Sequence, residues 1–241
     1  MNPQQLAASL KKVNLAWSSQ HIKEHLSLAE SQNFSFAKFL QNLLDDEIAH
    51  RKEKRIAERL RQSKLRVKKS IENFDFTFPE KINGKLVKSL FDLSFINDKK
   101  NVILIGPPGV GKTHIASALC YYGCLNDYKC RFITAMNLIN ELNASVSDNS
   151  FLSLMRRYAS FEMLIIDELG YLPVDKQGAD LLFQIISNRY ETGSVVVTTN
   201  RPFADWGRVF NNDATLAGAL IDRLAYHRII IEIEGKSYRV N

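Results

Sequence analysis

Two short stretches of the sequence carry residue types that could do chemistry. The first, GPPGVGKT, runs from Gly106 to Thr113 and fits the pattern of Gly, four residues, Gly, Lys and then Ser or Thr. The second, MLIIDELGYLP at 163–173, places two adjacent carboxylates, Asp167 and Glu168, directly after an apolar run. Adjacent carboxylates repel each other, so the pair favours a site that holds a cation over a purely structural role.

The first stretch has the composition of a phosphate-binding loop. An apolar run, NVILIG, precedes it, and a helical pattern, HIASALCYYGCL, follows it. Glycines let the backbone wrap a phosphate with its N–H groups pointing inward, and the next helix adds its positive dipole end. A Gly- and Pro-rich turn is the alternative, but the complete motif in this context favours a nucleotide. The residues predicted to contact the nucleotide are Gly106, Pro107, Pro108, Gly109, Val110, Gly111, Lys112, Thr113 and His114.

Roles within the predicted site follow from charge and position. We expect Lys112 to supply a positive charge to the β- and γ-phosphates and Thr113 to offer its hydroxyl to Mg²⁺. Asp167, at the end of an apolar strand, is expected to hold the same ion. Glu168 is placed to take a proton from the attacking water or to orient it. An exposed acidic strand end is the weaker alternative.

Two further polar residues are candidates for the same reaction. Asn200 follows the apolar run SVVVTT, where it could polarise the attacking water, although a turn-forming Asn before Arg201 and Pro202 is an equal alternative. Arg223 lies near the end of a helical pattern. It could reach the γ-phosphate of another subunit, or it could pair with Asp222 or another acid.

The elements that must position these residues alternate along the chain. Apolar runs at 101–106, 130–135, 163–167, 194–199 and 228–233 are separated by helical patterns at 112–126, 136–144, 151–159, 177–191 and 213–226. This alternation predicts a parallel five-stranded sheet covered on both faces, which is a three-layer α/β fold. Ligands of such sheets bind at the carboxyl ends of the strands, where the carboxylate pair is expected.

The segment before this pattern has a different character. Up to about residue 72 the apolar spacing is helical, and Ser35 is a plausible N-cap for a long helix. Residues 74–78 then alternate Phe with polar residues, and Pro79 and Gly84 interrupt any helix. We therefore expect a small helical domain at 1–72, a linker with a first helix at 73–100 and the nucleotide-binding core at 101–241.

The positive charge of the chain is concentrated in one run. The net charge is +6, but residues 51–69 hold ten bases against two acids, a net +8 that leaves −2 for the remaining residues. Local basicity favours a polyanionic partner, and nucleic acid is the first candidate. A solvated helix with ion pairs such as Glu47 with Arg51 is the alternative.

Other features of the sequence exclude some classes of protein. No stretch reaches the roughly 18 to 20 uninterrupted apolar residues of a membrane span, and the N-terminus lacks a signal pattern. We expect a cytoplasmic protein without a membrane partner. The three cysteines, Cys120, Cys124 and Cys130, suit buried reduced thiols better than a disulfide framework or a zinc site.

Together these motifs resemble the AAA+ ATPases, and specifically the IstB-like ATP-binding proteins, which are helper ATPases of two-component insertion sequences related to the DnaC and DnaI helicase loaders. The resemblance covers nearly the whole chain. It rests on FDF, LIGPPGVGKTHIASAL, LIIDELGYLP, TTNRPFADWGRVF, AGALIDRL and GKSYRV. DELGYLP and NRPFADWG are the most specific of these and favour the transposition helper over the loaders.

The resemblance implies roles for individual residues. The Walker A motif would contain Lys112 and Thr113, the Walker B motif would contain Asp167 and Glu168, and Asn200 would be sensor 1. Arg223 resembles an arginine finger that completes a neighbour's site, and Arg239 resembles the sensor-2 arginine. The C-terminal helical lid of typical AAA+ proteins would be missing. Residues 136–160, which carry Arg156 and Arg157, lie where initiator-type relatives have an extra helix facing DNA, although amphipathic core packing is the rival interpretation.

The function implied is an ATPase that uses ATP and Mg²⁺, forms a homo-oligomer with ATP between subunits, assembles on double-stranded DNA and assists a transposase of the same element. The alternative is a loader of a replicative helicase. A metabolic kinase is a distant third, because the sequence shows no evident small-substrate pocket or lid.

Overall fold

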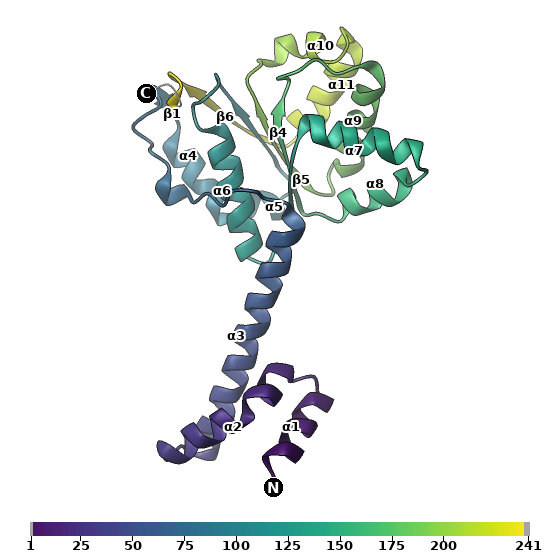
Figure 1. Cartoon of the computed structure of the whole chain (residues 1–241). Coiled ribbons are helices and arrows are strands. Elements are labelled where there is room, and N and C mark those ends of the chain that lie inside the picture. Colours follow the sequence, from purple (N-terminus) through teal and green to yellow (C-terminus); the bar gives the residue numbers. More distant parts are fainter. Residues whose placement is uncertain (1, 239–241) are drawn as a thin grey trace. The chain divides into compact units, whose positions relative to one another are not determined.

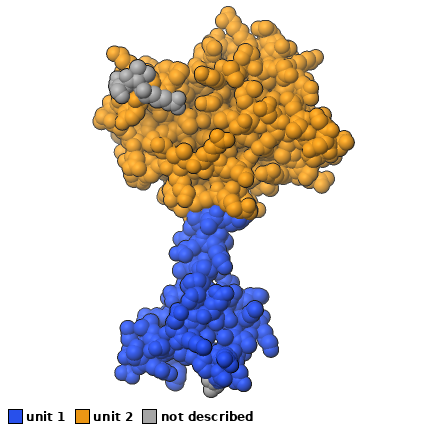
Figure 2. All heavy atoms as spheres, in the orientation of Figure 1, with its two compact units in different colours: residues 1–58 blue, residues 59–241 orange. Residues whose placement is uncertain are grey.

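The computed structural model describes residues 2–238 of the chain. The chain divides into two compact units, residues 1–58 and residues 59–241, which Figure 2 shows in different colours. The assignment of separate roles to 1–72, 73–100 and 101–241 stays a prediction.

The first unit is helical. It contains α1 (Pro3–Lys12), α2 (Ala16–Ser31) and most of α3 (Phe36–Ser63). The Ser35 hydroxyl accepts a hydrogen bond from the Lys38 N–H at 3.2 Å, which confirms the predicted N-cap of α3. Glu47 is buried, and it accepts hydrogen bonds from the backbone and hydroxyl of Ser18. Burial would raise the pKa of Glu47, but these bonds and the predicted ion pair with Arg51, at 2.9 Å, together lower it.

Helix α3 ends earlier than the sequence pattern indicated. The helical pattern was expected to continue to about residue 72, but Lys64 adopts a φ of +56°, which a right-handed helix cannot accommodate. The Ser63 hydroxyl accepts a hydrogen bond from the Leu65 N–H at 3.2 Å and so closes the helix end. A short 3₁₀ helix, η1 (Ile71–Asn73), follows.

The second unit is built on one sheet with the strand order β1-β6-β2-β5-β4-β3 (Figure 1). Five strands run parallel, as predicted: β2 (Asn101–Ile105), β3 (Cys130–Thr134), β4 (Met163–Leu169), β5 (Ser194–Thr199) and β6 (Arg228–Glu234). The sixth strand, β1 (Lys81–Ile82), pairs antiparallel with β6. It was not predicted, because two residues are too short for an alternating pattern.

Helices cover both faces of the sheet and confirm the three-layer fold (Figure 1). One face carries α4 (Gly84–Ser89), η2 (Leu90–Asp92), α5 (Ser94–Asn97) and α6 (Lys112–Leu125). The other carries α7 (Ala135–Ser147), α8 (Phe151–Ala159), α9 (Lys176–Arg189), η3 (Phe203–Asp205), α10 (Trp206–Val209) and α11 (Ala214–Ala225). Strand residues alternate between two apolar clusters: Met163 and Ile165 face α6, whereas Leu164 and Ile166 face α7 and α9.

The fold bears on the state of the cysteines and on membrane-spanning helices. All three cysteines are buried and carry free thiols, as predicted. Within residues 2–238, no helix is long and apolar enough to cross a membrane.

A buried arginine links the end of α9 to the end of α8 and the start of β5. Arg189, at the end of α9, is 2% exposed, and its guanidinium donates to the carbonyl oxygens of Tyr158 (2.6 Å) and Ser194 (3.1 Å). Burial lowers the pKa of Arg189 to about 10, so the side chain stays charged at neutral pH. The charge therefore faces backbone carbonyl dipoles at the end of α8 and the start of β5.

We expect Arg189→Met to destabilise the protein by about 2–4 kcal/mol, because it removes the buried hydrogen bonds from the guanidinium to the carbonyl oxygens of Tyr158 and Ser194. Urea unfolding of the full chain would measure the change. Arg208→Met, at an exposed position on α10, is the matched control and should stay within about 0.5 kcal/mol of wild type. Equal stability of the two variants would contradict a structural role for Arg189.

Candidate nucleotide-binding and hydrolysis site

The phosphate-binding loop lies between the end of β2 and the start of α6, as predicted. Gly111 has a φ of +97°, a conformation that glycine adopts without strain. A Cβ on Gly106 would lie 2.1 Å from the carbonyl oxygen of Ile233, so only glycine fits against β6 there. The Lys112 ammonium donates to the carbonyl oxygens of Gly106 (2.8 Å) and Pro107 (2.7 Å), which places its charge over the loop.

The loop is packed against the segment that precedes the sheet. Val110 is buried, and Phe74 packs edge-on against the ring of His114. His114 donates through Nε2 to the carbonyl oxygen of Ser70 at 2.8 Å. The contact of His114 with the nucleotide stays a prediction. In the structure, His114 links α6 to residues 70–74.

A β-bulge shapes the end of β4. Ile166 pairs with Val197 and Leu169 pairs with Thr199, so two residues, Asp167 and Glu168, face the single residue Thr198. Glu168 has a φ of +61° and is exposed, whereas Asp167 is 3% exposed. The bulge thus separates the two adjacent carboxylates.

Thr198 is a residue of the site that sequence reasoning missed. Its hydroxyl accepts a hydrogen bond from the Glu168 N–H at 2.9 Å and donates to Asp167 Oδ1. One buried hydroxyl therefore fixes the backbone of one carboxylate and the side chain of the other. A polar residue near the end of the otherwise apolar run SVVVTT was the available signal.

The donor set around Asp167 fits a magnesium ion. The Thr113 hydroxyl donates to Asp167 Oδ1 at 3.0 Å, so the two residues predicted to hold the ion are in contact. Mg²⁺ prefers hard oxygen ligands and is usually held by one or two carboxylates together with substrate phosphates. Thr113 and Asp167 supply such oxygens beside the loop.

Asn200 lies between the loop and the carboxylates. It follows β5, which is the strand between β2 and β4 in the sheet. The Gly106 N–H donates to the carbonyl oxygen of Thr199 at 3.2 Å, which brings the two strand ends together. Asn200 Oδ1 is buried and has no hydrogen-bond partner among the described residues. A buried acceptor without a donor fits a bound water or substrate group.

The Gly-Tyr-Leu-Pro tail that follows the carboxylates forms a turn. Gly170 has a φ of +86°, and the Tyr171 N–H donates to the carbonyl oxygen of Glu168 at 3.3 Å. Tyr171 and Leu172 are exposed, at 62% and 48%. Two large apolar side chains are therefore presented at the surface immediately after Glu168.

A cavity of about 690 Å³ adjoins the loop and is large enough for a nucleotide. It is lined by Gly109 to His114, by residues of the segment before the sheet and by Tyr238. Phe78 packs edge-on against Tyr238 with ring centroids 4.7 Å apart. These rings give the cavity an apolar surface, which suits a nucleobase, in addition to the polar groups of the loop.

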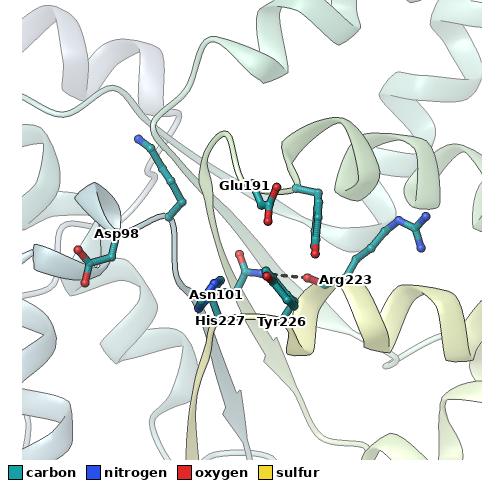
Figure 3. A pocket seen from close by; sticks show the side chains of 8 residues that line it. Asp98, Asn101, Glu191, Arg223, Tyr226 and His227 are labelled. Carbon is teal, nitrogen blue, oxygen red and sulfur yellow. Dashed lines mark hydrogen bonds between the residues drawn. The ribbon is translucent and has the colours of Figure 1, made fainter.

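Arg223 lies at the other end of the sheet. Its carbonyl oxygen accepts a hydrogen bond of 3.3 Å from the Asn101 side chain at the start of β2 (Figure 3). The loop follows the opposite end of this five-residue strand, roughly 13 Å away at the usual rise per residue. The guanidinium packs over the Phe183 ring, 4.5 Å from its centroid, and extends away from the other labelled residues (Figure 3). Arg223 therefore does not join the loop of its own chain.

The structure brings most of the predicted site together. Lys112, Thr113, Asp167, Glu168 and Asn200 meet at the carboxyl edge of the sheet. The last predicted site residue, Arg239, lies outside the described residues.

Comparison with known proteins identifies relatives of the whole chain. The family model described as IstB-like ATP binding protein matches residues 8–241. A protein of Geobacillus stearothermophilus whose assigned name is ATP-binding protein of insertion sequence IS5376 is 38% identical over 212 residues, which cover 88% of this chain and 84% of the relative. The corresponding protein of insertion sequence IS21 from Pseudomonas aeruginosa is 36% identical over 236 residues, which cover 98% and 89%.

Solved structures show the same fold at lower identity. AMPPCP-bound DnaA from Aquifex aeolicus has a TM-score of 0.59 at 18% identity, over 71% of this chain and 51% of DnaA. The DnaC helicase loader has a TM-score of 0.55 at 18% identity, over 68% of this chain and 96% of DnaC. The match to DnaA thus spans about half the length of that protein, whereas the match to DnaC spans nearly all of it. With its phosphate loop, its carboxylate pair and a fold of the AAA+ type, this ATPase belongs to the family of IstB-like ATP-binding proteins.

Proposed function

We propose that this chain is an ATP-driven assembly factor that oligomerises on duplex DNA and assists the transposase of its insertion sequence. The observation that carries the proposal is the position of Arg223, at the opposite end of β2 from the phosphate loop. Within residues 2–238, Arg223 lies too far from the phosphate loop of its own chain to act on a nucleotide bound there. Stacking one chain on the next would bring the Arg223 of one chain to the nucleotide site of its neighbour.

Hydrolysis in such an assembly follows from the geometry of the loop edge. Lys112 and the loop N–H groups bind the phosphates, and Thr113 and Asp167 are the residues that would hold Mg²⁺. That ion, when bound, neutralises phosphate charge. Asn200 offers its free acceptor to the attacking water, and Glu168, exposed on the bulge, takes the proton. The Arg223 guanidinium of a neighbouring chain stabilises the charge on the γ-phosphate.

The proposal of a DNA partner rests on charge. Residues 51–69 carry a net +8, and clustered bases of this kind bind the phosphate backbone of nucleic acids. Aromatic residues that would stack on unpaired bases are absent from this run, which favours duplex DNA over single strands.

The proposal of a transposase partner rests on the relatives. Proteins that share at least 36% of their residues with nearly the full length of this chain carry the names of insertion sequences. A helicase loader is the second candidate, favoured by the fold likeness to DnaC. A complex formed with a hexameric helicase but not with duplex DNA would decide for the loader.

Glu168→Gln should bind ATP with unchanged affinity but hydrolyse it about 10²- to 10⁴-fold more slowly, because the amide cannot accept the proton of the attacking water. With ATP and duplex DNA the variant should persist as a DNA-bound oligomer, visible by electron microscopy. Nucleotide binding and steady-state phosphate release would be measured in parallel. Wild-type turnover by the variant would remove Glu168 from the role of base.

Thr198→Val should lower kcat about 10- to 100-fold with little change in the KM for ATP, because the variant lacks the two hydrogen bonds that orient the carboxylates. Thr198→Ser, which keeps the hydroxyl, is the matched control and should recover most of the activity. Equal impairment of the two variants would show that packing at this position, rather than the hydroxyl, sets the rate.

Arg223→Ala should retain ATP binding but hydrolyse ATP about 10³-fold or more slowly, as expected for a residue that acts like an arginine finger. Lys112→Ala should be inactive because it fails to bind ATP. Mixing the two variants should restore part of the activity, since a Lys112→Ala chain still offers an intact Arg223 to its neighbour. No recovery in the mixture would argue against action between chains.

A further inference from the structure

A second hollow lies in the unit of residues 59–241 and shares no lining residue with the cavity beside the phosphate loop. A cleft of about 390 Å³ opens where the end of α3, the start of β3 and the end of α8 meet. Seven described residues line it: Arg61, Gln62, Lys64, Lys129, Arg157, Ser160 and Phe161. Four of them are bases and none is an acid. Three segments that are distant in the sequence therefore converge to make one basic cleft.

Among residues 2–238, three of the four bases have no counter-charge bonded to them. Lys64, Lys129 and Arg157 are exposed, and none of these three side chains has a hydrogen bond or ion pair within the described part of the chain. Two nearby acids are already engaged: Glu162 accepts a hydrogen bond from the Lys129 backbone N–H at 2.9 Å, and Asp127 pairs with Arg59. Like charges gathered in one cleft repel each other, and an anion bound among Lys64, Lys129 and Arg157 would offset that repulsion.

The backbone at Lys64 makes this position suitable for a glycine substitution. Lys64 occupies the left-handed conformation just past the end of α3, with a φ of +56°. Glycine or asparagine is the favoured residue at such a position, because a Cβ is strained there. The Lys64 side chain lines the basic cleft.

We propose that the basic cleft binds consecutive phosphates of a nucleic-acid strand, so that the core as well as the basic run grips the DNA. This inference rests on the DNA partner proposed above. Arg61 and Lys64 belong to the basic run at 51–69, whereas Lys129 and Arg157 lie outside it. The aromatic residue of the cleft, Phe161, is only 6% exposed, so it offers no face for base stacking. Recognition in the cleft is therefore by charge and is independent of sequence.

The test measures how binding to a duplex depends on salt. The double variant Lys129→Gln with Arg157→Gln should bind DNA about tenfold or more weakly than wild type in the presence of ATP. The slope of log affinity against log salt should fall by about one for each phosphate that the protein no longer neutralises. The weakening should be the same on two duplexes of unrelated sequence, and ATP hydrolysis without DNA should be unchanged.

The matched control removes the same charge from other elements. Lys85 on α4 and Lys176 on α9 are exposed, and Lys85→Gln with Lys176→Gln should keep the wild-type affinity and salt slope. Lys64→Gly provides a second variant, since glycine suits the backbone there: it should keep or raise thermal stability while it weakens DNA binding. Lys99→Gly, at the same φ of +56°, is its control.

The outcomes separate this inference from the proposed function. If wild type binds duplex DNA and the cleft variants match their controls in affinity and salt slope, the basic cleft is not a phosphate site, while the proposed function stands. Equal weakening in the cleft variants and in the controls would also overturn it. If wild type does not bind duplex DNA, both the inference and the proposed DNA partner fail.

Discussion

The active edge of this protein depends on one inserted residue in β4. Along a regular strand, residues 164, 166 and 168 would all face α7 and α9, and Glu168 would be driven into an apolar cluster. The bulge changes the alternation, so that Leu169 takes the core position beside Leu164 and Ile166 while Glu168 turns out to the surface. The Thr198 hydroxyl stabilises the bulge, since it accepts a hydrogen bond from the Glu168 N–H and donates one to the Asp167 carboxylate. The proposed magnesium ligand and the proposed base thus have distinct environments although they are neighbours in the chain.

The parallel sheet places the remaining groups by topology. Because β5 lies between β2 and β4, Asn200 emerges between the phosphate loop and the carboxylates. Helix α11, which precedes β6, ends at the opposite edge of the sheet, where β2 begins. Arg223 is therefore separated from the phosphate loop by the length of β2. A sheet that ran antiparallel would have mixed these two edges. The separation of nucleotide and arginine is therefore a consequence of strand direction, and it makes the proposed site one that two chains complete.

Much of this arrangement follows from the sequence because it is encoded in local patterns. The five apolar runs and their helices lie within a few residues of the expected positions, and the phosphate motif fixes its own loop through Gly106 and Gly111. Features that depend on distant residues were not evident. The bulge at Asp167 requires knowing that Thr198 lies opposite, and the two-residue strand β1 exists only because β6 supplies a partner. The early end of α3 is set by the backbone at Lys64 rather than by any break in the apolar pattern.

The left-handed backbone at Glu168 has a consequence for how the protein can change. A glutamate in this conformation costs about 1–2 kcal/mol relative to glycine, so the most stable residue at position 168 is one that cannot take a proton. Selection for thermal stability alone would therefore favour replacement of the proposed base by a residue without a carboxylate. With Glu168 as the base, resistance to heat and ATP turnover make opposite demands on this single position.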